Sequence, residues 1–78
     1  MIDFVTTKKL TDLQENQWAE IARFSDETMA SRMMSMGILP GSYIFMMKKA
    51  PMKGGVCLKI DNNKVALRCS EADTILIK

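Results

Sequence analysis

Apolar residues in the middle of the chain recur with a helical period over a short stretch. Met29, Met33 and Met36 are spaced i, i+4 and i+7, and Ala30 and Met34 widen the same face. This spacing is typical of the apolar stripe of an amphipathic helix. The pattern therefore predicts one short helix whose methionine stripe packs against the core.

The residues on either side of this stretch set the limits of the helix. Ser25 or Asp26 can cap its start, because both side chains accept hydrogen bonds from free backbone N–H groups. Gly37 stands where a C-terminal cap requires left-handed dihedrals, and Ile38 follows at the apolar position of a Schellman motif. We expect the helix to end at Met36.

A tight turn and a strand follow the helix. Pro40 and Gly41 suit the central positions of a type II turn. A strand is expected from Ser42 to Lys49, because apolar side chains continue up to the pair Ala50-Pro51. Two sets of side chains alternate along this strand, Ile44 with Met46, and Tyr43 with Phe45 and Met47.

Period-two patterns predict four more strands. The first runs from Trp18 to Phe24, and the pattern leaves its core face open because both faces have apolar members. Residues 55–60 and 64–69 form a hairpin around 61–63, and after a single turn at 71–73 the last strand, 74–78, buries Ile75 and Ile77.

The turn of the hairpin decides where the two cysteines point. If Asn62-Asn63 is a two-residue turn, Leu58 lies opposite Leu67 and Cys57 points away from the face that carries Cys69. Two reduced cysteines are then expected, whereas a three-residue turn would change the parity. The shared face would hold Val56, Leu58, Ile60, Val65, Leu67 and Cys69.

Short strands, tight turns and one inserted helix predict a mainly β protein. We expect a small closed sheet of about five strands, a barrel that leaves no exposed edges. The 78 residues suit one domain, 1–78, in which 1–9 form an N-terminal extension that adds an edge strand or covers the barrel. No apolar run could cross a bilayer and no signal peptide is evident, so a cytoplasmic location is expected.

The residue types available argue against catalysis and against a metal or cofactor site. Histidine is absent, which removes the commonest general base and transition-metal ligand. Eight methionines are present, and thioethers are soft ligands, but Met29, Met33 and Met36 have the spacing of core residues. The sequence predicts no enzyme, no cofactor and no bound metal.

Positive charge gathers in residues 48–68, close to Tyr43 and Phe45. This segment has six basic residues and only Asp61 as an acidic one, and a solvated lysine face is the common explanation. Aromatic rings beside lysines also suit single-stranded nucleic acid or an acidic protein partner. The six are Lys48, Lys49, Lys53, Lys59, Lys64 and Arg68.

The order of several motifs resembles that of the FeoA family, small proteins associated with bacterial ferrous iron uptake. Residues 32–41, RMMSMGILPG, are similar to the family signature, and the resemblance covers residues 10–78. Asn16 stands where the family has Gly, and Asn tolerates left-handed dihedrals next best. The other motifs are Leu10-Thr11-Asp12-Leu13, Ala50-Pro51, Gly54-Gly55, Val65-Ala66-Leu67-Arg68, Glu71-Ala72 and Ile75.

The resemblance implies a fold, a function and a partner. The family has an SH3-like barrel in which the positions of Ile44 and Met46 face inward, which leaves Tyr43 and Phe45 outside. It implies a non-enzymatic accessory or regulator of ferrous iron uptake that docks on the cytoplasmic, GTP-binding part of the FeoB permease. The expected partner-binding residues are Tyr43, Phe45, Lys48, Lys49 and Lys53.

Two other functions stay open for the same fold. SH3-like domains similar to this family occur at the end of metal-dependent repressors, so one alternative is a module that binds or senses a transition metal. The other is a small barrel that binds nucleic acid, although no nucleic acid is expected as the partner. A monomer is the default oligomeric state.

Overall fold

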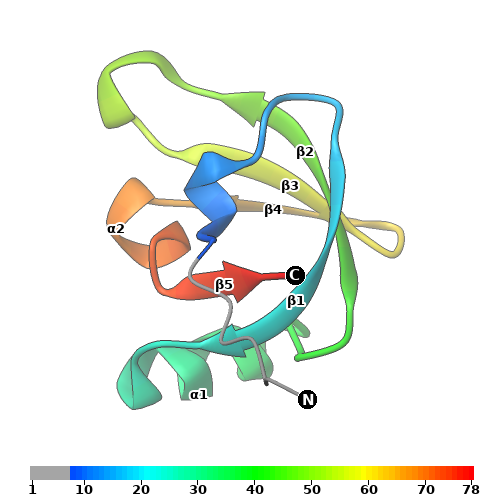
Figure 1. Ribbon diagram of the computed structural model, residues 1–78, viewed down its shortest axis with the longest axis vertical. Coiled ribbons are helices and arrows are strands. Elements are labelled where there is room, and N and C mark those ends of the chain that lie inside the picture. The colour runs from blue at the N-terminus through cyan, green and yellow to red at the C-terminus, as the bar shows by residue number, and fades with distance from the viewer. Residues whose placement is uncertain (1–7) are drawn as a thin grey trace, which may run out of the picture.

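The computed structural model describes residues 8–78 as a strongly curved antiparallel sheet of five strands (Figure 1). The strand order is β4-β3-β2-β1-β5, so β4 and β5 are the two edges. The mainly β, SH3-like fold that the sequence predicts is confirmed. The strands are β1 (Trp18–Phe24), β2 (Tyr43–Lys49), β3 (Val56–Ile60), β4 (Asn63–Leu67) and β5 (Ile75–Ile77).

The helical elements connect the strands. The α-helix α1 (Glu27–Ser35) joins β1 to β2, and the short helix α2 (Cys69–Ala72) joins β4 to β5. Two 3-10 turns, η1 (Leu10–Asp12) and η2 (Pro51–Lys53), precede β1 and β3. No helix within residues 8–78 combines the length and the apolar character needed to cross a membrane.

The expected closed sheet is wrong in one respect, because β4 and β5 do not pair with each other in the described chain. The connection between them forms α2 instead of a tight turn, and β5 is only three residues long. The free edge of β5 pairs with Lys8 and Lys9. The N–H of Ile77 donates to the carbonyl of Lys8 at 2.9 Å, and Lys9 forms an isolated antiparallel bridge with Leu76. Residues 1–7 of the predicted N-terminal extension lie outside the described residues.

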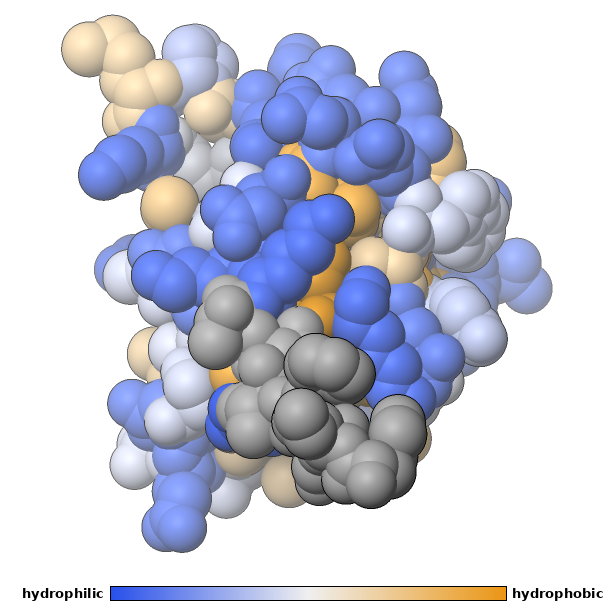
Figure 2. Space-filling view, in the orientation of Figure 1, coloured by the Kyte–Doolittle hydropathy of each residue, from blue (hydrophilic) through white to orange (hydrophobic). Residues whose placement is uncertain are grey.

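The core lies inside the curve of the sheet and follows the period-two pattern. Ile44 and Met46 of β2 are fully buried, as are Ile75 and Ile77 of β5, which confirms both expectations. Burying one such side chain stabilises the fold by about 1.5–3 kcal/mol. From the viewpoint of Figure 2 the surface is mostly hydrophilic, with a narrow strip of hydrophobic residues between the polar ones.

The structure also decides which face of β1 is the core face. Ala19 and Ile21 are buried, so the first strand places Trp18 on the outer side of the sheet. Asn16 has the expected left-handed conformation, with φ 68°, and its N–H donates to the carbonyl of Met46 at 2.7 Å. The turn before β1 therefore survives without glycine.

The limits of α1 agree with the sequence pattern. Asp26 is the N-cap, and its carboxylate accepts hydrogen bonds from the N–H groups of Thr28 and Met29. At the other end Gly37 has φ 86°, and Ile38 N–H donates to the carbonyl of Met33 at 2.9 Å, which confirms the Schellman cap.

The predicted methionine stripe is wrong at its last member. Met33 is fully buried, but Met36 is 45% exposed, and Met34, which was expected to widen the same face, is 43% exposed. Met36 is the C-cap, with φ −94° and ψ 5°, so the helical spacing no longer applies to its side chain. Ile38, fully buried, supplies the apolar side chain at this end of the helix.

The hairpin turn consists of Asp61-Asn62, not of Asn62-Asn63. Ile60 pairs with Asn63, and Leu58 therefore lies opposite Val65 instead of Leu67. Asp61 takes left-handed dihedrals, with φ 56°, which is why the turn can begin one residue earlier. The register differs from the expected one by two residues, so the same side chains face inward. Cys69 starts α2 instead of ending the strand. Both cysteines are unbridged and half-buried.

Candidate protein-interaction surface

Three aromatic side chains lie together on the outer face of the sheet. Trp18 pairs with Phe45 across β1 and β2, and their ring centroids are 4.9 Å apart at an interplanar angle of 48°. Tyr43 is two residues from Phe45 along β2, so it projects from the same face. Trp18 is 64% exposed and Tyr43 is 62% exposed. We refer to Trp18, Tyr43 and Phe45 as the aromatic face.

Charged residues surround the aromatic face. Lys59 lies directly opposite Phe45, and Lys64 lies opposite Lys59 on the next strand. On the other side Glu20, the cross-strand neighbour of Tyr43, forms an ion pair of 2.8 Å with Lys78. The hydrogen bond that Lys78 donates lowers the pKa of Glu20 and raises the pKa of Lys78. Exposed rings with a charged rim are the usual composition of a protein interface.

The five residues predicted to bind the partner do not all lie on this surface. Tyr43 and Phe45 belong to the aromatic face, and Lys48 is exposed and pairs with Cys57. Lys49 lies elsewhere, because β2 has an irregularity between Met46 and Lys48 that turns the end of the strand.

Lys49 and Lys53 line a cavity beside η1 and α2. The ammonium group of Lys49 donates to the carbonyl of Thr11 at 2.8 Å, and its backbone N–H donates to the carboxylate of Glu15. These two lysines therefore lie at the cavity, apart from the aromatic rings. A bulge cannot be read from alternation alone, which is why the sequence did not reveal it.

Trp18 is the member of the aromatic face that sequence reasoning missed. Its strand has apolar residues on both faces, so period-two alternation gave no decision. The one available signal was Glu20, which shares a face with Trp18. A carboxylate in the middle of a strand is rarely buried without a partner, so its face is expected to be the outer one.

Comparison with known proteins shows the family of the chain. Residues 8–78 match the FeoA domain. The chain belongs to the FeoA domain family. No curated protein has a sequence significantly similar to this one.

Solved structures show the same FeoA-domain fold. A FeoA-like protein from Clostridium acetobutylicum is 26% identical with a TM-score of 0.84, and the match covers 96% of this chain and 88% of that one. Iron(II) transport protein A from Clostridium thermocellum is 31% identical with a TM-score of 0.80, over 90% of this chain and 44% of that one. This chain thus spans less than half the length of that protein.

The FeoA domain is also similar to part of a repressor. A manganese-dependent transcriptional repressor in complex with manganese superposes with a TM-score of 0.87 over 99% of this chain and 38% of that one, at 21% identity. At 21% identity this similarity shows a shared fold only. Within residues 8–78 no three His, Cys, Asp or Glu side chains come together as a group that could hold a metal ion.

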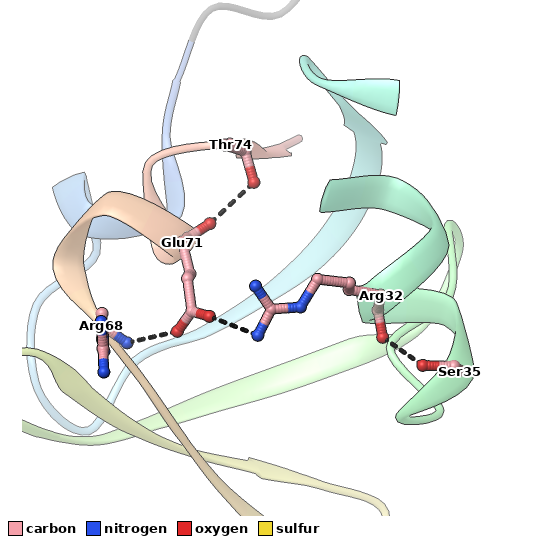
Figure 3. A network of polar contacts seen from close by, with 5 residues as sticks. All are labelled: Arg32, Ser35, Arg68, Glu71 and Thr74. Atoms are coloured by element: carbon pink, nitrogen blue, oxygen red, sulfur yellow. Dashed lines mark hydrogen bonds and ion pairs between the residues drawn. The ribbon is translucent and has the colours of Figure 1, made fainter. Parts of the chain in front are cut away.

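Two residues of the FeoA-like motifs join the helices of the domain (Figure 3). The guanidinium of Arg32 on α1 lies 3.1 Å from one carboxylate oxygen of Glu71 on α2. The other oxygen of Glu71 accepts the backbone N–H of Arg68 at 2.8 Å. Thr74 donates through its hydroxyl to the carbonyl of Glu71. The contacts of these motif residues are internal, so they stabilise the domain.

Proposed function

We propose that this FeoA-domain protein is a non-enzymatic accessory or regulator of ferrous iron uptake. It acts in the cytoplasm by docking on the cytoplasmic, GTP-binding part of a FeoB-type permease. Membership of the FeoA domain family supports the link to iron uptake, and the similar Clostridium thermocellum protein is called iron(II) transport protein A. The single observation that carries the docking proposal is the exposed aromatic face.

The aromatic face has the properties of a binding hot spot. Trp18 and Tyr43 each leave more than half of their area in water, at 64% and 62% exposure, so a partner can bury a large apolar area there. The ring of Phe45 packs against that of Trp18 at a tilted angle of 48°, with the centroids 4.9 Å apart. Tyr and Trp dominate hot spots, and truncating one costs about 2 kcal/mol or more of binding free energy.

Charge around the rings would select the partner. Lys59 and Lys64 lie opposite each other on the outer face, and like charges in this position repel. An acidic partner surface that contacts both lysines would relieve this repulsion. The partner surface is therefore an apolar pocket beside acidic side chains.

Binding of the purified cytoplasmic domain of the permease tests the proposal. Trp18 is the only tryptophan, so its fluorescence reports the aromatic face directly, and its emission should shift to the blue when a partner covers it. The double variant Tyr43→Ala with Phe45→Ala should keep its melting curve and bind about thirtyfold more weakly. Met52→Ala is the matched control, because Met52 is 98% exposed and lies outside the aromatic face.

Each outcome decides a separate point. A folded double variant that binds as tightly as the parent would remove the aromatic face from the interface. Failure of the parent to bind the permease domain would remove the proposed function. Nucleic acid is the rival ligand of this surface, and its binding would weaken steeply and log-linearly with salt, whereas an aromatic-centred protein interface should weaken only modestly.

A further inference from the structure

A cavity of about 400 Å³ is lined by residues of η1, the loop after β2 and α2. Its volume falls within the range of small-ligand sites. Among residues 8–78 no aromatic ring lines it, so this wall offers a planar base or sugar ring nothing to stack on. The charged lining residues are Lys9, Lys49, Lys53, Asp12 and Asp73.

We refer to this site as the basic cavity, because three lysines and two carboxylates line it. Each of the two carboxylates accepts one hydrogen bond from the chain itself. The backbone N–H of Lys9 donates to Asp12 at 3.0 Å, and the hydroxyl of Thr11 donates to Asp73 at 2.7 Å. The Thr11–Asp73 bond joins η1 to the end of α2, whereas the Lys9–Asp12 bond is local to the η1 turn.

Within residues 8–78, the ammonium groups of the cavity lysines form no ion pair, although the backbone N–H groups of Lys9 and Lys49 donate to the carboxylates of Asp12 and Glu15. Lys49 is part-buried, and among the described residues its ammonium group donates to the carbonyl of Thr11 alone. The ion pairs within residues 8–78 are Arg32–Glu71 and Glu20–Lys78, and neither involves a lysine of the cavity. The ammonium group of Lys49 has three N–H donors, and one of them is used by the carbonyl of Thr11. The other two donors and the partly desolvated positive charge can therefore attract an anion.

The loop that carries Lys53 is strained. Met52 and Lys53 are consecutive non-glycine residues with φ 57° and φ 59°, and both lie in the left-handed region. Strained backbone of this kind gathers at ligand-binding sites. Here the two left-handed residues turn the loop so that Lys53 becomes part of the cavity wall.

We propose that the basic cavity binds a small oxyanion with at least two negative charges. Lys49 is the central contact, with Lys9 and Lys53 at the rim. Ammonium groups bind carboxylate and phosphate oxygens alike as point charges, so the shared chemistry is a multivalent oxyanion, carried by an acyclic polycarboxylate or by a phosphate compound. This site is separate from the aromatic face and does not depend on the proposed function.

Titration of the full chain, followed by the NMR shifts of its backbone amides, tests the proposal. Citrate probes the polycarboxylate source and pyrophosphate the phosphate source, each against sodium chloride at the same ionic strength. We expect saturable shifts at Thr11, Lys49 and Gly55 with at least one oxyanion, and the tighter of the two identifies the source. Shifts that never saturate, or that sodium chloride reproduces, would overturn the site.

Two lysine variants locate the binding. Lys53 makes no hydrogen bond or ion pair in the described structure, so Lys53→Ala should leave the fold intact and weaken the oxyanion about fivefold. Lys64→Ala is the matched control, because Lys64 is an exposed lysine on the outer face, and it should change the affinity less than about twofold. Equal affinities of parent and Lys53→Ala would exclude the cavity.

Lys49→Met removes the central contact and should abolish saturable binding. Lys49 also holds η1 through Thr11, so its melting curve is recorded first. If this variant unfolds, the comparison of Lys53→Ala with Lys64→Ala decides the question alone. A folded Lys49→Met that still binds the oxyanion would overturn the proposal.

Discussion

The carboxylate of Glu71 bridges the two helices, with one oxygen 3.1 Å from the guanidinium of Arg32 and the other 2.8 Å from the N–H of Arg68 (Figure 3). The side chain of Glu71 is 13% exposed and that of Arg32 is 60% exposed. Glu71 should therefore contribute more to the free energy of unfolding than Arg32 does, because Glu71 also caps α2 and is largely shielded from water.

We expect Glu71→Ala to lower the free energy of unfolding by about 1–2 kcal/mol, because it removes the cap and the ion pair together. Arg32→Ala should cost about 0–1 kcal/mol, since the pair is screened on its exposed side. Urea titration of the two variants beside the parent measures the difference. Equal losses would show that the cap contributes nothing.

Gly37 is held in a conformation that other residues avoid. Its φ is 86°, and an added Cβ would meet no atom within 4 Å, so any cost of substitution comes from the backbone alone. Gly37→Val should destabilise the protein by about 1–3 kcal/mol, and Gly37→Asn by clearly less, because Asn tolerates left-handed dihedrals. Denaturant titration compares the two. A valine variant as stable as the parent would contradict the Schellman cap at this position.

The Glu20–Lys78 pair makes a pH-dependent contribution to stability. The pKa of Glu20 is lowered in the folded state, so its contribution is present above the ordinary pKa of about 4.5 and is lost as the pH falls through the folded value. The pKa of Lys78 is raised above its ordinary 10.5, so its contribution is complete below that pH and is lost as the pH rises through the folded value.

Glu20→Gln should therefore flatten both ends of the stability profile. The effect should be small and should shrink in high salt, because the pair is exposed. Melting temperatures between pH 3 and pH 11 would show it, with Asp26→Asn as a matched acidic control, because Asn keeps the helix cap. An unchanged acid limb in Glu20→Gln would contradict the assigned pairing.

We expect no tight site for iron(II) or zinc(II). The chain has no histidine, and the thioethers of Met33 and Met46 are fully buried in the core. Calorimetry with each ion at neutral pH should give no stoichiometric heat at micromolar concentrations. Sub-micromolar binding of one ion per chain would instead favour a metal-sensing role for the domain.

The amino-acid sequence by itself determined the local elements of this protein. Asp26 and Gly37 limit α1 because capping depends on one side chain and on one backbone dihedral, both of which are local. The strand positions and the inward set Ile44 and Met46 follow from period-two alternation and a family resemblance. The same alternation predicts that Tyr43 lies outside, and it is 62% exposed.

Only the tertiary structure decided how these elements meet. Trp18 joins the aromatic face because β1 pairs with β2 in one register, and no pattern within β1 specifies that register. Lys49 lies at the cavity because one bulge changes the side of the sheet from which the last residues of β2 project. Pairing and bulges depend on contacts between segments far apart in the chain, so the surfaces they create appear only after folding.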